Sequence, residues 1–125
     1  MQIKTLESLL EDANKIIKRL SYDETLEMLS AAESVIIDVR EESEVQASGL
    51  IKGAINIPKS LFDNNFSSNL IESHIDDPDK TKILMYCAVG VRSAFVGLTL
   101  VNQGYKNVLN IGGYSEWVSN GGPTN

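Results

Sequence analysis

The sequence predicts a single α/β domain built on a largely parallel β-sheet. Short runs of β-branched and other apolar residues alternate along the chain with segments of helical pattern, as in successive βα units. The length of 125 residues suits one domain with one buried core. No internal repeat, low-complexity tract or linker divides the chain, so one domain accounts for all of the predicted elements.

The first predicted element is an amphipathic helix within residues 3–20. Its apolar residues recur at alternating spacings of three and four, namely Ile3, Leu6, Leu10, Ala13, Ile17 and Leu20. Residues 16–20 also fit a short strand, so the position where this helix ends stays open. We expect the helix either to pack on its own domain or to form a homodimer through residues 3–20, because short coiled coils share this spacing.

The remaining elements are predicted from capping signals, apolar runs and breakers. Ser21 followed by Glu24 is a capping-box pattern that begins a helix over 22–32. Strands are predicted where β-branched and apolar residues cluster, at 35–39, 54–57, 82–86 and 108–111. Further helical segments are predicted at 41–47, within 59–76, at 93–103 and at 114–119. The tail 121–125 is predicted to be disordered.

Composition and charge disfavour several kinds of partner. Seventeen acidic and eleven basic residues give a formal net charge of −6, which argues against binding to nucleic acid or anionic membranes. The apolar runs are too short to cross a bilayer, and the charged N-terminus is unlike a signal peptide, so we expect a cytoplasmic protein. One cysteine and one histidine, His74, exclude an internal disulfide and argue against a metal site; no cofactor is predicted.

Cys87 is the candidate catalytic residue, because it lies directly between a predicted strand and a predicted helix. Sites in open α/β sheets form beyond the carboxyl ends of the strands. The N–H groups of residues 88–92 and the helix N-terminus can surround the sulfur there and favour its thiolate. Gly90 permits the tight turn that such a loop needs, and Ser93 is predicted to be the N-cap of the helix.

A lowered thiol pKa would make Cys87 a nucleophile at neutral pH. At the ordinary pKa of about 8.5, only about 3% of a thiol is ionised at pH 7, and each unit changes the ratio tenfold. The fixed charge of Arg92 suits an oxyanion with several acceptor oxygens, which indicates an anionic substrate. The simpler alternative is a buried cysteine without a catalytic role, beside a surface arginine.

Four segments of the chain together resemble single-domain rhodaneses, which share the sulfurtransferase fold. The segments are Asp38-Val39-Arg40, Gly49–Pro58, Cys87-Ala88-Val89-Gly90-Val91-Arg92-Ser93, and Gly104–Val108 followed by Gly112, Gly113 and Trp117. The third segment resembles the active-loop pattern C-x-x-G-x-R-S. The resemblance covers residues 21–121 and leaves 1–20 as an extra N-terminal helix and 122–125 as a tail. Leu50 and Lys52 depart from the family, which often has His and Pro at these positions.

The resemblance implies a three-layer α/β/α fold with a mainly parallel five-stranded central sheet. It implies that Cys87 takes the outer sulfur of thiosulfate or a related anion as a persulfide and passes it to cyanide or a thiol. The implied donor-binding residues are Ala88, Val89, Gly90, Val91, Arg92 and Ser93. The implied structural supports are Asp38, Arg40, Gly112 and Gly113.

Two other functions stay open on the sequence alone. Phosphatases of this fold have a C-x5-R loop, whereas Arg92 lies five residues after Cys87 and closes a smaller C-x4-R ring. A smaller ring suits a sulfur atom better than a phosphate, so sulfur transfer is favoured. The other function is that of a non-catalytic rhodanese-like module that binds a protein or carries sulfur. A purely binding module has no need of Cys87 or Arg92.

Overall fold

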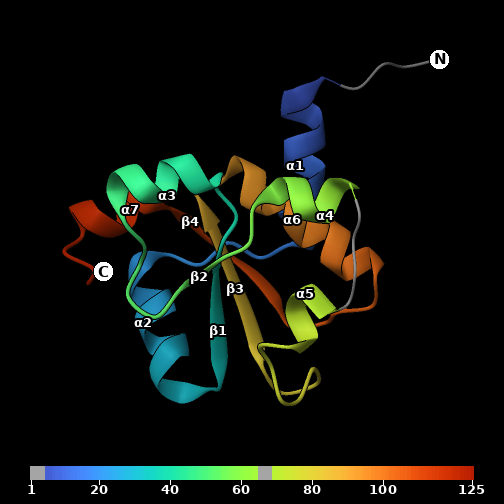
Figure 1. Cartoon of the computed structure of the whole chain (residues 1–125). Helices are drawn as coiled ribbons and strands as arrows, with labels where there is room; N and C mark the ends of the chain where they lie inside the picture. The colour runs from blue at the N-terminus through green and yellow to red at the C-terminus, as the bar shows by residue number, and fades with distance from the viewer. Residues whose placement is uncertain (1–4, 65–68) are drawn as a thin grey trace.

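A computed structural model of the chain describes residues 5–64 and 69–125. Its elements in chain order are α1 (Leu6–Ile16), α2 (Tyr22–Ala31), β1 (Ser34–Asp38), α3 (Glu42–Ser48), β2 (Ile55–Asn56), α4 (Lys59–Asn64), α5 (Asn69–Glu72), β3 (Lys82–Cys87), α6 (Val91–Asn102), β4 (Val108–Gly113) and α7 (Tyr114–Ser119). The strands form one sheet in the order β2-β1-β3-β4, and all of its neighbouring strands are parallel (Figure 1). Ile3, and residues 65–68 of the predicted helical stretch 59–76, lie outside the described residues.

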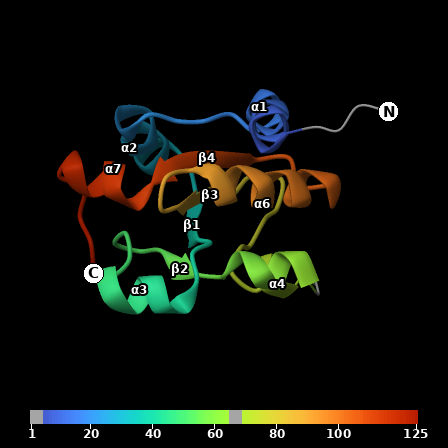
Figure 2. The same cartoon turned by 90° about the horizontal axis from the view of Figure 1, so that it is seen from above.

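Two apolar clusters, one on each face of the sheet, produce the predicted three-layer α/β/α arrangement. Along β3, Met85 and Cys87 belong to the cluster beneath α1, α4, α5 and α6. Leu84 and Tyr86 belong to the other cluster, beneath α2 and α7. Figure 2, viewed along the sheet, separates α1, α4 and α6 on one side from α2, α3 and α7 on the other. The strand period of two therefore turns Tyr86 away from Cys87.

The described sheet has four strands, so the expectation of five is wrong. Residues 18–20 run beside β4, but Arg19 forms only an isolated parallel bridge with Asn110. The Asn110 N–H donates to the Lys18 carbonyl at 3.0 Å, and the Leu20 N–H donates to the Asn110 carbonyl at 2.9 Å. Pairing around one residue makes a bridge rather than a strand. The alternative prediction, that residues 16–20 form a short strand, is thus correct in part.

The predicted helix boundaries hold where a specific cap determines them. The capping box of α2 is present, because the Glu24 N–H donates to Ser21 Oγ at 3.1 Å and the Ser21 N–H donates to Glu24 Oε1 at 2.9 Å. Gly49 ends α3 with a φ of 87°, a conformation that favours glycine. By contrast, α6 begins at Val91, earlier than predicted, after Gly90 at a φ of 94°.

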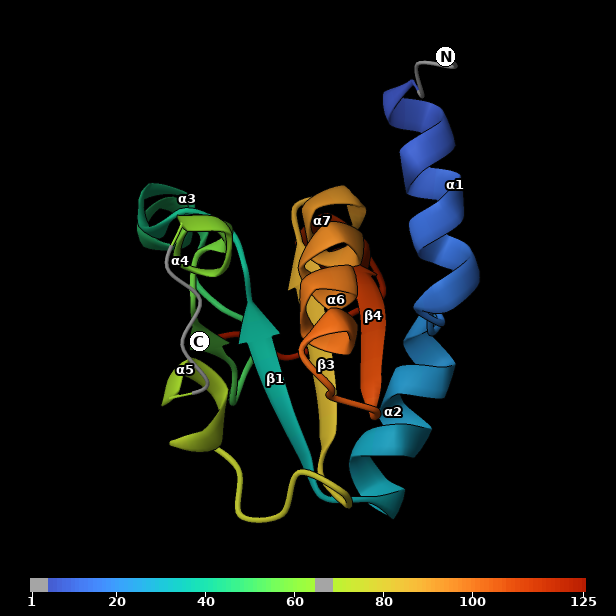
Figure 3. The ribbon, with the colours of Figure 1, turned by 90° about the vertical axis from the view of Figure 1, so that its right-hand side faces the viewer.

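Helix α1 packs against α6 through one side only. Ala13 and Ile17 are fully buried there, whereas Leu6, Leu9 and Ile16 are exposed. In Figure 3, the upper part of α1 extends well past the other helices. Within residues 5–64 and 69–125, no helix is both long enough and apolar enough to cross a membrane.

The C-terminal residues are held against the loop that precedes β2, so the prediction of a disordered tail is wrong. The Lys52 N–H donates to the Pro123 carbonyl at 3.0 Å, and the Asn125 N–H donates to the Leu50 carbonyl at 2.9 Å. The indole N–H of Trp117 also donates to the Pro123 carbonyl, at 2.9 Å. Composition suggested disorder, but these backbone pairings bind the segment to the domain.

Candidate active site

Cys87 is the last residue of β3, one of the two central strands, and its side chain is buried. The chain then turns at Gly90, whose left-handed conformation directs its N–H back toward the strand end. This N–H donates to Cys87 Sγ at 3.0 Å. The loop after the cysteine therefore folds over the sulfur before α6 begins.

The environment of Cys87 favours its thiolate. Burial acts to raise the pKa of the thiol, but hydrogen bonds from the Ser93, Val89 and Gly90 amides and from the Ser93 hydroxyl lower it more. The net result is a Cys87 pKa below its ordinary value. No imidazole contributes to this shift, because donors to the charged form are sufficient. The thiolate is therefore stabilised by the loop itself.

Ser93 contributes to this site from within α6, so its predicted role as N-cap is wrong. Gly90 occupies the N-cap position, and Ser93 lies in the first turn with its side chain fully buried. Its hydroxyl has one proton, which it can donate either to Cys87 Sγ, 3.6 Å away, or to Asn110 Oδ1, 2.8 Å away. The serine hydroxyl is thus directed to the sulfur and to β4 rather than to an unpaired helix N–H.

Asn110 joins three parts of the loop region, and the sequence prediction did not include it. Its side-chain N–H donates to the Gly90 carbonyl at 3.0 Å, and its Oδ1 accepts from the Gly112 N–H at 2.9 Å as well as from Ser93. The residue is buried in β4. A polar residue within the apolar run 108–111 was the signal that could have identified it.

Gly112 and Gly113 lie directly against the cysteine loop at the end of β4. A Cβ added to Gly113 would overlap the Ala88 carbonyl oxygen and would lie 2.8 Å from the Val89 Cα. Gly112 has a φ of 93°. The backbone of β4 can therefore approach the loop this closely only because these positions lack side chains.

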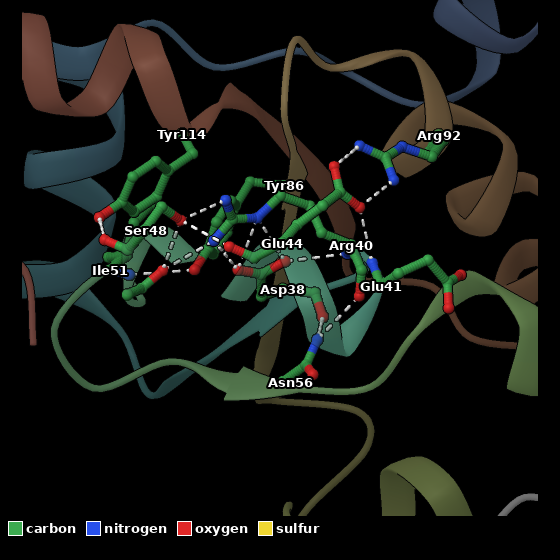
Figure 4. Close-up of polar contacts among 11 residues, drawn as sticks. Asp38, Arg40, Glu41, Glu44, Ser48, Ile51, Asn56, Tyr86, Arg92 and Tyr114 are labelled. Atoms are coloured by element: carbon green, nitrogen blue, oxygen red, sulfur yellow. Dashed lines mark hydrogen bonds and ion pairs between the residues drawn. The ribbon is translucent and has the colours of Figure 1, made fainter. Parts of the chain in front are cut away.

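Arg92 is held by Glu44 of α3, as Figure 4 shows. Its Nη1 and Nη2 donate to the two carboxylate oxygens at 2.6 and 2.8 Å. The hydrogen bond to Arg92 is the main reason that the pKa of Glu44 is lowered to about 2. The pKa of Arg92 is raised, first by Glu44 and further by its proximity to Cys87. The guanidinium is thus near the sulfur but already has a carboxylate partner, which the sequence did not predict.

Asp38 and Arg40 form a buried ion pair beside the Arg92–Glu44 ion pair (Figure 4). Arg40 Nη2 donates to Asp38 Oδ2 at 2.7 Å, and Nη1 donates to Ser48 Oγ at 2.8 Å. The guanidinium also lies over the ring of Tyr114, 4.3 Å from its centroid. These contacts attach the end of β1 to α3 and α7, and so place Glu44 opposite the cysteine loop.

The rest of the loop faces outward. The Val89 side chain is 64% exposed, Val91 is partly buried, and the Ala88 carbonyl accepts from Ser115 Oγ at 3.4 Å. Leu50 and Lys52 pair instead with the C-terminal residues. In the described part of the chain, no cluster of three or more His, Cys, Asp or Glu side chains is arranged to hold a metal ion.

Comparison with known proteins shows the family of this chain. The family model of the rhodanese-like domain matches residues 21–120. A thiosulfate sulfurtransferase GlpE of Pseudoalteromonas translucida is 32% identical over 101 residues, which cover 80% of this chain and 88% of the relative. The structure of a thiosulfate sulfurtransferase from Pseudomonas aeruginosa is 28% identical with a TM-score of 0.75, covering 94% of this chain and 21% of that one.

One similar structure carries a different description. It is a protein of unknown function from Rhodopseudomonas palustris CGA009, described as a possible tyrosine phosphatase. It is 27% identical to this chain, with a TM-score of 0.81, and the match covers 100% of this chain and 97% of that one. Similarity to this protein includes the N-terminal residues that precede the family match.

Proposed function

Because the chain belongs to the rhodanese-like domain family, we propose that it is a sulfurtransferase in which Cys87 carries the sulfur. The Cys87 thiolate attacks the outer sulfur of thiosulfate or a related donor. A new S–S bond forms, the bond between the two donor sulfurs breaks, and sulfite leaves with the electron pair. The product is a Cys87 persulfide, and this step needs neither a metal nor a redox cofactor.

The second step returns Cys87 to its starting state. A nucleophilic acceptor, cyanide or a thiolate, attacks the terminal sulfur of the persulfide and takes it as thiocyanate or as a new persulfide. The Cys87 thiolate leaves, which a lowered pKa favours. The chain has one cysteine, so an external molecule must act as the acceptor.

The observation that supports this proposal best is the 3.0 Å hydrogen bond from the Gly90 N–H to Cys87 Sγ. An N–H directed at Sγ stabilises the thiolate before attack, and stabilises it again when it leaves in the second step. The Val89 and Ser93 amides act in the same direction. We assign the binding of the sulfur-donor anion mainly to these loop amides. Arg92 adds positive charge near the sulfur, but its guanidinium is already paired with the Glu44 carboxylate.

The test is intact-mass analysis of the protein after treatment with thiosulfate. We expect the addition of one sulfur atom, its loss on addition of cyanide, and no addition to Cys87→Ser. The Ser115→Ala variant is the matched control, because its hydroxyl contacts the loop carbonyl of Ala88 and not the sulfur. Failure of thiosulfate and of other sulfane-sulfur donors to add sulfur would overturn the proposal.

Phosphatase activity is the second candidate, because the similar protein from Rhodopseudomonas palustris is described as a possible tyrosine phosphatase. The loop here has the arginine five residues after the cysteine, and that arginine is bound by Glu44 on both nitrogens. A phosphate dianion would have to displace this carboxylate. Turnover of an aryl phosphate that Cys87→Ser abolishes would favour this candidate over sulfur transfer.

A non-catalytic protein-binding or sulfur-carrier module is the third candidate. The lowered pKa of Cys87 argues against a purely binding role, since such a role gives no reason to stabilise a thiolate. A module that carries sulfur without turnover would be persulfidated by a donor but would not release sulfur to cyanide or small thiols. The mass experiment therefore separates the carrier from the enzyme by its second step.

A further inference from the structure

Arg19 lies against the cysteine loop, although it precedes residues 21–120, which match the family. A Cβ added to Gly90 would lie 3.3 Å from the Arg19 Cζ, and one added to Gly112 would lie 2.9 Å from its Nη2. Gly90 is the residue whose N–H donates to Cys87 Sγ. We propose that Arg19 is a positioning residue for Cys87, which supports the loop conformation that directs the Gly90 N–H to the sulfur.

The backbone of the N-terminal segment explains why Arg19 reaches this place. Arg19 forms a parallel bridge with Asn110: the Asn110 N–H donates to the Lys18 carbonyl at 3.0 Å, and the Leu20 N–H donates to the Asn110 carbonyl at 2.9 Å. The side chain of the same Asn110 donates to the Gly90 carbonyl and accepts from the Gly112 N–H. One buried residue therefore fixes both the segment that carries Arg19 and the two glycines that its guanidinium contacts.

The guanidinium itself is oriented by Glu116 of α7. Arg19 Nη2 donates to Glu116 Oε2 at 3.0 Å, and about half of each side chain is exposed. Glu116 Oε2 would also lie 3.2 Å from a Cβ at Gly112. The guanidinium thus lies over both glycines, and the carboxylate lies beside Gly112. Removing Arg19 leaves Gly90, in its left-handed conformation, with fewer neighbours, and removing Glu116 leaves the guanidinium without the partner that orients it.

Two ion pairs, which come from four different parts of the fold, lie at the cysteine loop. Arg92 of α6 pairs with Glu44 of α3, and Arg19 of the N-terminal segment pairs with Glu116 of α7. Each arginine is balanced by one carboxylate. The effect of Arg19 on Cys87 therefore comes mainly through the position of the loop and less through its charge, which gives the proposal a specific test.

The test measures the rate at which iodoacetamide alkylates Cys87 across the pH range, in Arg19→Gln and in Glu116→Gln. Arg19→Gln removes the guanidinium, and Glu116→Gln removes the charge that orients it, so both profiles should move to higher pH. We expect a shift of about half a unit, which is a threefold fall in rate at pH values below the thiol pKa. If Arg19 acted by charge alone, Glu116→Gln would move the profile to lower pH. That result, or an unchanged profile in either variant, would overturn the proposal.

Lys18→Gln is the matched control. It removes one positive charge at the neighbouring position, but the electrostatic influence of Lys18 is on Glu24 rather than on the loop. Its profile should equal that of the unmodified protein. The proposal deepens the function proposed above, but alkylation requires no sulfur donor. A failed sulfur transfer with shifted profiles would therefore contradict the proposed function and not the role of Arg19. If the Arg19→Gln variant does not fold, the Glu116→Gln variant still tests the proposal, because the Glu116 side chain is about half exposed.

Discussion

The reactivity of Cys87 depends on two opposing effects on one atom. Burial raises the pKa of the thiol, and the amide and hydroxyl donors around it lower the pKa. A change of one unit alters the ratio of thiolate to thiol tenfold, so the loss of a single donor has a measurable effect on rate. Ser93 is a suitable residue for such a test, because it provides both an amide and a hydroxyl to the sulfur.

Replacing Ser93 with Ala removes the hydroxyl that lies 3.6 Å from Cys87 Sγ and leaves the amide in place. A group that stabilises the thiolate is lost, so the pKa of Cys87 rises and less thiolate is present at pH 7. At pH values below the thiol pKa, we expect alkylation and persulfide formation to slow by about threefold, because hydrogen bonds to the charged form lower a pKa. The pH dependence of iodoacetamide alkylation measures this shift. Equal profiles for Ser93→Ala and the control Ser115→Ala would contradict it.

The sequence pointed to Cys87 as the candidate nucleophile, but not to the residues of other elements that surround it. Cys87, Gly90 and Arg92 are visible as a local pattern because they act within one loop. Glu44 binds Arg92 from 48 residues away, and local periodicity contains no information about such a contact. Ser93 was assigned to the helix cap because serine is common there, but the positive φ of Gly90 allowed the helix to begin earlier.

At the scale of elements, Glu44 links α3 to the cysteine loop, and this link should depend on pH. Arg92 lowers the pKa of Glu44 from 4.5 to about 2. A carboxyl group with a lowered pKa stabilises the fold fully above pH 4.5, and this contribution is lost as the pH falls toward 2. Because both side chains are about one-third exposed, we expect a modest contribution of about 0.5–1 kcal/mol.

The measurement is urea denaturation of Glu44→Gln and the unmodified protein at pH 7, 4 and 2.5. The difference in unfolding free energy should be largest at pH 7 and smallest at pH 2.5. Glu42→Gln, on the same helix, is the control, because the Glu42 carboxylate accepts from the Gln46 side chain at 3.4 Å, whereas Arg92 is paired with Glu44. A difference that is constant with pH would contradict the link.

Lys52 provides a second test at this scale, because the rhodanese pattern often has Pro at its position. Proline has no N–H, whereas the Lys52 N–H donates to the Pro123 carbonyl at 3.0 Å. We expect Lys52→Pro to lower the free energy of unfolding by about 1 kcal/mol, the usual net value of one hydrogen bond. Lys52→Ala keeps the N–H and should change stability by less than about 0.5 kcal/mol.

A truncated chain identifies the cause of the Lys52→Pro effect. In a chain that ends at residue 122, the acceptor is absent, so Lys52→Pro should cost much less than in the full chain. An equal cost in both backgrounds would mean that strain in the loop, and not the lost hydrogen bond, is responsible. Urea denaturation of the full chain and of the truncated chain, each with and without Lys52→Pro, gives the comparison.

The positions of helices and strands could be predicted where neighbouring residues in the sequence determine them. They could not be predicted where a segment distant in the sequence supplies the hydrogen bonds. The runs that became β1 and β3 are continuous and apolar, and the capping box of α2 lies within four residues. Residues 18–20 are extended because Asn110 of β4 offers backbone hydrogen bonds to them. The tail after Gly121 is ordered because it meets the loop 50–52. Neither partner is near in sequence.

At the scale of the whole molecule, α1 is part of the core rather than an appendage. Ile17, which follows α1, is fully buried, and a Cβ at Gly97 of α6 would lie 3.1 Å from both its Cγ1 and the Met85 Cε. Ile17→Ala should therefore lower the unfolding free energy by about 2–4 kcal/mol, through lost burial and the cavity that remains.

Ile16→Ala is the matched control for this prediction. Ile16 is 59% exposed, so the same truncation one residue earlier should cost less than about 0.5–1 kcal/mol. Denaturant midpoints of the two variants give the comparison. Similar losses for both would mean that α1 does not dock through Ile17 in solution.

The apolar side chains that α1 leaves exposed raise the question of a homodimer through residues 3–20. Within residues 5–64 and 69–125, α1 exposes Leu6, Leu9 and Ile16, the first of them by 67%. Eleven residues make a helix of about 16 Å, and stable interfaces bury at least about 1,000 Å², so this surface alone is too small for a strong dimer.

We therefore expect light scattering to give the mass of one chain at concentrations up to about 100 μM. A dimer with a Kd well below this concentration would give twice that mass. The double variant Leu6→Gln and Leu9→Gln is the suitable comparison. Deleting residues 1–20 would instead remove buried Ile17 and Leu20 and so disturb the fold. Equal masses for the two proteins fit a monomer whose extra helix supports its own domain. A dimer that the double substitution abolishes would show that α1 joins two chains, and it would place the Arg19 segment of each chain close to that interface.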